Sequence, residues 1–323
     1  MAWEQTTGRQ MINPKNSSFQ SADFFKLIIK GFCIGIANAI PGISGGTIAF
    51  ILGLYEDLIS SIKLIDTKFL RLLFSFKIKE AIDYIPWKFL GSVVFGAMLA
   101  IVSFAKIITW LLHEKPILIN SFFFGLIIAT IPIIGRIITK WTFSKIVSLL
   151  LAALLTYGLS KLVPMDTPEA SWFIFLCGII AISTMILPGI SGSFVLVLLG
   201  KYFYILEAVN DRNFAVLSIF ALGACIGLLV FVRILSWLFN KYHDITISAL
   251  TGIVIGSLSK VWPWKETIKF VTSHSGKIVP IEQVSILPKT IDLELIFAIV
   301  LMITGIISAL ILSSSSEEKP VKA

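Results

Sequence analysis

The pentapeptide Pro-Gly-Ile-Ser-Gly, found at residues 41–45 and again at 188–192, decides the fold of this chain. A glycine and a tyrosine follow both copies at the same separation, as Gly53 with Tyr55 and Gly200 with Tyr202. Further matches keep the same order along the chain: Gly31 with Gly178, Gly96 with Gly223, Lys106 with Arg233, Trp110 with Trp237, and Gly125 with Gly252. An ordered series of this kind indicates an internal repeat.

Each pentapeptide interrupts an apolar segment, at 23–63 and at 171–209. As one helix, such a segment would be about 55 Å long or more, far beyond the ~30 Å hydrocarbon core of a bilayer. Proline removes a helical hydrogen-bond donor and clashes with the preceding turn, so the first arm should end near Ile40 or Leu187. We therefore expect two re-entrant helical hairpins that turn at the pentapeptide and leave on the side from which they came. Non-helical backbone at membrane depth must be buried in protein or line a cavity, which points to a functional site.

The composition is that of an integral membrane protein. Hydrophobic residues make up 56% of the chain and charged residues only 14%, and the mean hydropathy is +0.92. Soluble domains contain roughly 25% charged residues. Six apolar runs are each near the ~20 residues that cross a bilayer; they lie at 89–112, 117–135, 143–163, 214–239, 245–260 and 293–312.

These segments predict an all-α polytopic membrane protein built from two repeats. Each repeat has one hairpin and three transmembrane helices, and the repeats cover 23–163 and 171–312. Three is an odd number, so the second repeat enters the membrane from the opposite face. Inverted repeats with broken helices are the architecture of secondary transporters. The flanking tails, 1–22 and 313–323, are expected to be mobile.

The charge pattern predicts orientation rather than a nucleic-acid partner. The net charge is +8, but the basic residues lie between the apolar runs and form no single stripe. The N-terminal segment, the connector 63–88 and the loop 136–145 carry more Lys and Arg than the loops on the other side. Both termini are therefore expected to be cytoplasmic. The three cysteines and three histidines have no disulfide or metal-ligand spacing, and we expect no metal and no cofactor.

The hairpin tips are the candidate site. Gly42 or Gly189 can take a left-handed cap, and Ser44 or Ser191 can cap the second arm. The start of that arm has free amide donors and little side-chain bulk, and a helix N-terminus of this kind is a ready anion site. Alternatively, the glycines only allow close packing between membrane helices. Two tips that come from opposite faces would meet at one central point.

Lys106 and Arg233 occupy aligned positions well inside spans, where they either neutralise a bound phosphate or extend to the interface. No Asp or Glu lies in the middle of a plain span, so a buried carboxylate relay is not evident. We expect substrate-binding residues but no catalytic residue. The predicted substrate-binding residues are Asn38, Pro41, Gly42, Ser44, Gly45, Gly46, Thr47, Lys106, Pro188, Gly189, Ser191, Gly192, Ser193 and Arg233.

With these motifs in view, the chain from about Asp23 to Leu312 resembles the bacterial membrane family first described as domain of unknown function 368, which includes the PopT-like polyprenyl-phosphate translocases. The resemblance implies a flippase of the bacterial cytoplasmic membrane. Its substrate would be undecaprenyl phosphate, which it would return to the cytoplasmic leaflet so that the lipid carrier can be reused in cell-wall synthesis. The residues alone indicate only a transporter for an anion, whose oligomeric state they leave open.

The pentapeptide also resembles the Pro-Gly-x-Ser-Arg-Ser signature of BacA-type undecaprenyl-pyrophosphate phosphatases. Gly45 and Gly192 stand where those enzymes have arginine, and no Glu-x-x-x-Glu helix is present. A phosphatase needs positive charge at the transferred phosphoryl group and a base or metal that activates its nucleophile. Binding without hydrolysis is therefore favoured, and a phosphatase or a small-anion carrier stays as the alternative.

Overall fold

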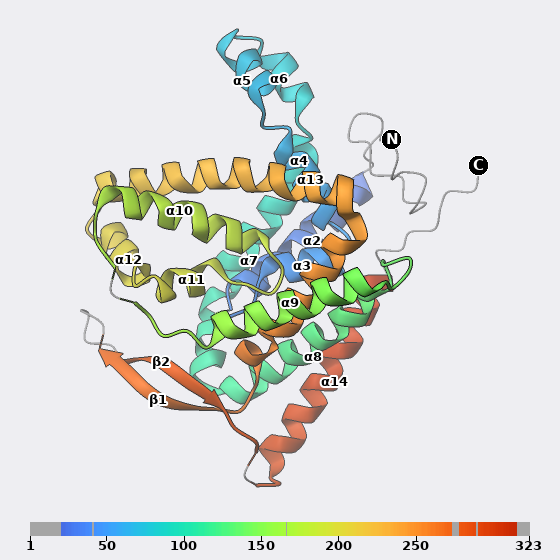
Figure 1. Cartoon of the computed structure of the whole chain (residues 1–323), viewed down its shortest axis with the longest axis vertical. Coiled ribbons are helices and arrows are strands. Elements are labelled where there is room, and N and C mark those ends of the chain that lie inside the picture. The colour runs from blue at the N-terminus through green and yellow to red at the C-terminus, as the bar shows by residue number, and fades with distance from the viewer. Residues whose placement is uncertain (1–20, 41, 166, 273–277, 289, 315–323) are drawn as a thin grey trace.

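The computed structural model describes residues 21–40, 42–165, 167–272, 278–288 and 290–314, and it is mostly helical (Figure 1). Five helices are long and apolar enough to cross a membrane. They are α7 (Trp87–Glu114), α8 (Pro116–Gly135), α9 (Phe143–Ser160), α13 (Phe214–Val261) and α14 (Leu293–Ser314). Helix α13 contains both predicted spans, 214–239 and 245–260, as two helical parts joined by a kink at Tyr242, whose φ of −135° and ψ of 47° are not helical. The prediction of a multi-pass helical membrane protein is confirmed.

The helix breaks before both pentapeptides. Helix α2 (Ser21–Asn38) and helix α10 (Ser171–Ile186) end within two residues of the predicted ends. Gly42 and Gly189 then take φ of 87° and 88°, a region that a side chain would strain. The chain resumes as α3 (Gly45–Ile51) and α11 (Gly192–Leu198). The chain therefore reverses at Gly42 and at Gly189 with nearly the same backbone φ.

A second break follows each pentapeptide, and the sequence did not predict it. Helix α3 is bent by 112° from α4 (Tyr55–Lys63), and α11 is bent by 106° from α12 (Tyr202–Asn210). Gly53 and Gly200 lie at these bends with φ of 66° and 64°. Gly53 and Gly200, which mark the repeat in the sequence, thus also mark the bends in the structure.

The two halves of the chain pack in matching ways. Helix α2 lies along α7, and α10 lies along the first part of α13; α9 packs on the second part of α13, and α14 packs on α8. Glycines make these approaches close: a Cβ on Gly31 would overlap the carbonyl oxygen of Val93, and one on Gly252 would overlap that of Leu149. Such contacts between small residues are typical of membrane helices.

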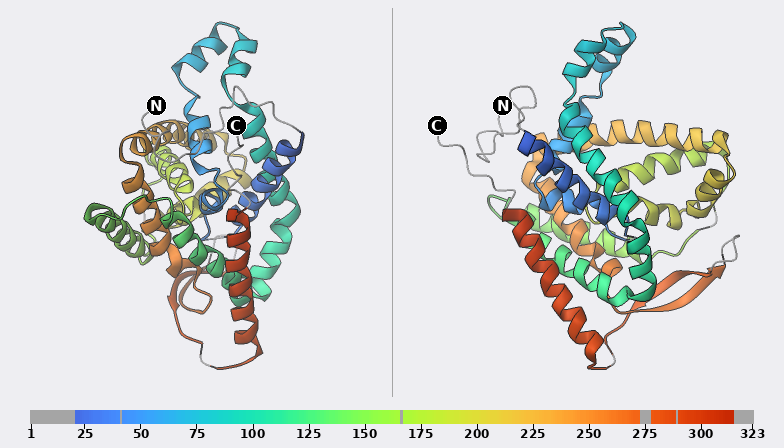
Figure 2. Two further views of the ribbon diagram at one scale, coloured as in Figure 1. Left: turned by 90° about the vertical axis from the view of Figure 1, so that its right-hand side faces the viewer. Right: turned by 180° about the vertical axis from the view of Figure 1, so that it is seen from behind.

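Two smaller features lie outside the spans, a pair of helices and a pair of strands. Helices α5 (Thr67–Phe74) and α6 (Ile78–Tyr84) project from one side, and an antiparallel pair, β1 (Lys265–Thr272) and β2 (Ile278–Ser285), lies toward the opposite side (Figures 1 and 2). The sequence predicted neither element, and the β-pair departs from a wholly α-helical chain. The start of α2 and the end of α14 face the α5–α6 side (Figure 2).

The predicted tails are each two residues too long, because Ser21 and Ala22 belong to α2 and Ser313 and Ser314 belong to α14. The rest of both tails lies outside the described residues.

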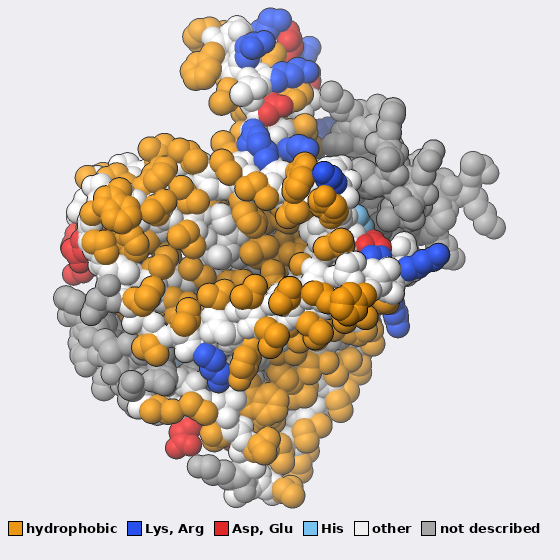
Figure 3. Space-filling model, in the orientation of Figure 1, with side chains coloured by type: hydrophobic (Ala, Val, Ile, Leu, Met, Phe, Trp, Pro, Cys, Tyr) orange, Lys and Arg blue, Asp and Glu red, His pale blue; other side chains and the backbone are white. Residues whose placement is uncertain are grey.

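The main hydrophobic core surrounds α3 and α4. Ile48, Ile51 and Ile59 are buried there against residues of α8 and the second part of α13. Helices α10 and α11 share only a small separate cluster around Cys177. Hydrophobic side chains cover most of the face shown in Figure 3, whereas Lys and Arg gather around α5 and α6. This face of the helical body is therefore suited to lipid (Figure 3).

Candidate functional site

The first tip (residues 38–47, of which Pro41 lies outside the described residues) is closed by its own polar groups. The backbone N–H of Gly45 donates to Oδ1 of Asn38 at 2.8 Å, and that of Gly46 donates to Oγ of Ser44 at 3.2 Å. The N–H of Thr47 donates to the Ser44 carbonyl at 3.0 Å. The first three amides of α3 are therefore occupied in this conformation. Asn38, predicted to contact a ligand, instead takes an amide that a ligand would use.

The second tip (residues 185–193) touches the first directly. Ser44 donates through Oγ to the carbonyl of Leu187 at 2.9 Å, and Gly189 donates through its N–H to Oγ1 of Thr47 at 2.9 Å. The hydroxyl of Tyr55 donates to the carbonyl of Ile186 at 3.2 Å. Ser44 and Thr47 are 3% and 0% exposed, so these bonds are shielded from water. Residues more than 130 positions apart thus form one polar junction inside the protein.

The second tip keeps its own donors open. Within the described chain, Ser191 makes no cap bond to α11, and the amides of Gly192 and Ser193 have no partner. The Ser191 and Ser193 hydroxyl oxygens lie 2.8 Å apart. The difference arises because Met185 stands where the first tip has Asn38, and a thioether is a poor acceptor. Ser191 is half-buried and Ser193 is exposed, so a ligand could reach these groups.

Lys260 lies beside the two tips, and the sequence did not single it out. A Cβ on Gly42 would lie 3.6 Å from the carbonyl oxygen of Lys260, and Nζ of Lys260 lies 4.1 Å from the ring centroid of Phe194 in α11. Lys260 ends a predicted span, so the sequence assigns it to a loop. The aligned residue of the first repeat is Ile133, and the repeat therefore gives no signal for it.

The structure does not bring Lys106 and Arg233 to the tips, contrary to their predicted place beside a bound phosphate there. The Arg233 guanidinium donates to the carbonyls of Leu229 at 2.6 Å and Ile65 at 2.9 Å, beyond the end of α4. Lys106 is exposed on α7. Lys106 and Arg233 occupy equivalent positions in the two repeats, but this equivalence does not determine which groups their side chains contact.

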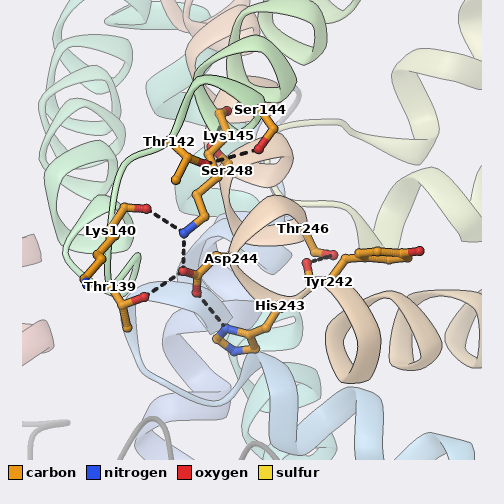
Figure 4. Close-up of polar contacts among 10 residues, drawn as sticks. All are labelled: Thr139, Lys140, Thr142, Ser144, Lys145, Tyr242, His243, Asp244, Thr246 and Ser248. Carbon is orange, nitrogen blue, oxygen red and sulfur yellow. Dashed lines mark hydrogen bonds and ion pairs between the residues drawn. The ribbon is translucent and has the colours of Figure 1, made fainter.

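A charged network lies at the α13 kink (Figure 4). Asp244 accepts from Nζ of Lys145 at 2.5 Å and from Oγ1 of Thr139 at 2.9 Å, and it lies 3.4 Å from Nδ1 of His243. Nε2 of His243 lies 3.3 Å from Oε1 of Glu56 in α4. The network therefore joins the α8–α9 connection, α13 and α4. No sequence pattern predicted it, because its members are distant in the chain.

A cavity of about 230 Å³ lies beside this network between α4 and α13. Its polar lining comes from Glu56, Ser60, Lys63, Ser236, Asn240 and His243. Lys63 donates through Nζ to Oγ of Ser236 at 3.0 Å across the cavity wall. Among the described residues, no group of three or more His, Cys, Asp or Glu side chains could hold a metal ion.

Comparisons with known proteins agree on one family. Residues 34–279 match the model of the VCA0040-like family, described as undecaprenyl phosphate translocase-like. The chain is 37% identical over 305 residues to a polyprenyl-phosphate transporter of Vibrio cholerae serotype O1, covering 93% of this chain and 99% of the relative. It is 32% identical over 254 residues to a polyprenyl-phosphate transporter of Staphylococcus aureus, covering 73% and 85%. No solved structure matches the chain.

Proposed function

The chain belongs to the undecaprenyl phosphate translocase-like family, and we propose that it carries undecaprenyl phosphate across the bacterial cytoplasmic membrane. The transporter names of both relatives support this assignment. The structural observation that carries it is the polar junction between the tips, where open amides and hydroxyls of the second tip adjoin Lys260. A charged phosphate pays a large desolvation penalty in hydrocarbon, and a polar junction at membrane depth lowers it.

We propose that the repeats at 23–163 and 171–312 have inverted topology and that each tip belongs to a re-entrant hairpin. The nearly equal φ of Gly42 and Gly189 supports the structural repeat and its two hairpins, as does the matched packing of α2 on α7 and α10 on α13. The odd number of spans in each repeat is what favours inversion. The basic α5–α6 side would face the cytoplasm, with both termini on that side. Undecaprenyl phosphate would then enter from the β1–β2 side and leave toward α5–α6, returning the carrier for cell-wall synthesis.

Alternating access would use the contact between the tips as the closed barrier. In this conformation Ser44 and Thr47 bond to the second tip. The phosphate would bind first to the amides and hydroxyls of Ser191, Gly192 and Ser193, assisted by Lys260. It would then take over the bonds of Ser44 and Thr47 as the tips separate. Gly42, Gly45, Gly46, Pro188 and Gly189 would shape the backbone of this passage, and the polyprenyl tail would stay in lipid.

Lys106 and Arg233 would serve the two ends of the pathway. Their aligned positions lie toward opposite faces if the topology is inverted. The Arg233 guanidinium would exchange the Leu229 and Ile65 carbonyls for phosphate oxygens, which its planar fork can hold in pairs. Exposed Lys106 would do the same near the other face.

The site favours binding over hydrolysis. A phosphatase with Ser191 as nucleophile would need a base within hydrogen-bond reach. The side-chain partner of Ser191 among the described residues is Ser193, a hydroxyl with no basic character. We therefore propose a transporter that is not an enzyme.

The test is reconstitution of the purified protein into liposomes that carry undecaprenyl phosphate in one leaflet. The protein should speed equilibration between leaflets over protein-free vesicles, and runs with and without a proton gradient would reveal coupling. Release of inorganic phosphate from undecaprenyl pyrophosphate would instead indicate the phosphatase. Flux of inorganic anions without lipid movement would indicate a small-anion carrier.

A further inference from the structure

Three lysines meet where α9, α13 and β1 approach one another. The hydroxyl oxygens of Ser160 and Ser259 lie 3.1 Å apart and hold the ends of α9 and α13 together. The next residues, Lys161 and Lys260, therefore lie near each other at the ends of α9 and α13. Lys265, the first residue of β1, donates through Nζ to the carbonyl of Lys260. We call Lys161, Lys260 and Lys265 the lysine cluster.

No carboxylate balances the lysine cluster within the described ranges: none of its members takes part in the ion pairs found there. Their contacts are neutral. Lys161 lies 5.4 Å from the ring centroid of Tyr157, Lys260 lies over Phe194, and Lys265 bonds to a carbonyl. Lys260 and Lys265 are also half-buried. Like charges that are partly removed from water repel strongly, and an anion placed among them reverses the sign of the interaction.

The lysine cluster lies next to the tips on the side away from α5 and α6. The backbone of Lys260 adjoins Gly42 and its side chain reaches α11, so the cluster is continuous with the second tip. Nε1 of Trp262 donates to the carbonyl of Ile286 at 2.8 Å, which ties this end of α13 to the chain after β2. Figure 3 shows an isolated basic group between α9 and the β1–β2 pair, remote from the basic groups around α5–α6.

We propose that the lysine cluster is an accessory binding site for a phosphate monoester, outside the tips on the β1–β2 side. A phosphate monoester carries about −1.5 to −2 charges near neutral pH and several acceptor oxygens, which suits a group of neighbouring lysines with neutral partners. The order of binding rests on the proposed function: the lipid headgroup binds to the lysine cluster first and to the second tip afterwards. The same chemistry would also accept inorganic phosphate, so both sources have to be tested.

Binding is measured by calorimetry on the full chain in phosphatidylcholine nanodiscs, with farnesyl phosphate and inorganic phosphate as separate probes. Lys161→Gln and Lys265→Gln each remove one charge-assisted contact, and each should weaken binding about 10-fold or more. Lys161→Arg keeps the charge and should bind nearly as wild type. Lys115→Gln removes an exposed lysine between α7 and α8, outside the cluster, and should leave the affinity unchanged.

Binding of both probes supports recognition of the phosphate group itself, and binding of farnesyl phosphate alone supports recognition of a phosphorylated lipid. Equal affinity in wild type, Lys161→Gln and Lys265→Gln would overturn the proposal, as would no binding of either probe to the wild type. Leaflet exchange of undecaprenyl phosphate separates the two hypotheses. If binding depends on the lysine cluster but the wild type moves no lipid, the cluster is a phosphate site and the proposed transport function is wrong. If all variants move lipid at the same rate and bind the probes with the same affinity, the lysine cluster is not a phosphate site and the proposed transport function is unaffected.

Discussion

The bond between Thr47 and Gly189 offers a direct test of the junction between the tips. Thr47→Val keeps the side-chain shape but removes the Oγ1 acceptor that lies 2.9 Å from the Gly189 amide. Thr47 is fully buried, so the amide would be left without water as a replacement. An unsatisfied buried donor costs ~1–3 kcal/mol. The Gly189 amide should then exchange its hydrogen roughly 5- to 150-fold faster, because opening of the junction costs that much less.

Hydrogen exchange read by mass spectrometry on peptides covering 185–195 measures this effect. Thr130→Val is the matched control, since Thr130 is equally buried but its hydroxyl bonds only to the Leu126 carbonyl of its own helix, at 2.8 Å. It should leave exchange at the second tip unchanged. Protection of the Gly189 amide that is the same in Thr47→Val as in the wild type would refute the assignment of this bond as a closing contact.

Three further predictions follow from the helices around the tips. Asp244→Asn removes the partly buried ion pair with Lys145, so the free energy of unfolding in mixed detergent micelles should fall by ~1–3 kcal/mol. Asp211→Asn removes an exposed carboxylate and should change the free energy of unfolding little. The same free energy of unfolding in Asp244→Asn and wild type would contradict the role of the network. Gly252→Ala places a methyl against the Leu149 carbonyl and should cost ~1–3 kcal/mol in the same assay, so an unchanged value would show that α9 and α13 are not closely packed. Burial and the neighbouring Lys260 charge lower the pKa of Lys265 to about 8. Because a bound anion favours the charged ammonium and raises that pKa, farnesyl phosphate binding at about pH 8.5 should take up protons. The calorimetric enthalpy should then depend on the buffer more strongly in wild type than in Lys265→Gln; a buffer-independent wild-type enthalpy would contradict this.

The sequence predicted the breaks before Pro188 and around Gly42 because proline and glycine act on the backbone locally. It also predicted the spans, since length and hydropathy alone define them. It missed the bends at Gly53 and Gly200, where a repeated glycine could equally have marked helix packing. The sequence does not predict the β1–β2 pair, although residues 265–272 are rich in β-branched residues, because a basic stretch between two spans indicates a loop.

The candidate site was harder to predict than the fold. Repeat matching identified both tips. It could not show that Asn38 accepts a hydrogen bond from a backbone amide of the first tip, whereas Met185 at the equivalent position accepts none from the described residues of the second. It pointed to Lys106 and Arg233 because they align, whereas Lys260 reaches the tips only through the packing of α13. Side-chain direction and contacts between distant segments depend on tertiary structure, which one sequence does not carry.

The central claim is that the open second tip passes the phosphate across the membrane. The measurement that tests it most directly is the rate of undecaprenyl phosphate movement between liposome leaflets for the double variant Ser191→Ala, Ser193→Ala. Ser218→Ala is the control, because the Ser218 hydroxyl bonds only to the Ala215 carbonyl of its own helix. Losing two hydroxyl contacts to a charged group should slow movement about 10-fold or more, with Ser218→Ala as fast as wild type. A double variant that is correctly folded and moves the lipid at the wild-type rate would contradict the account.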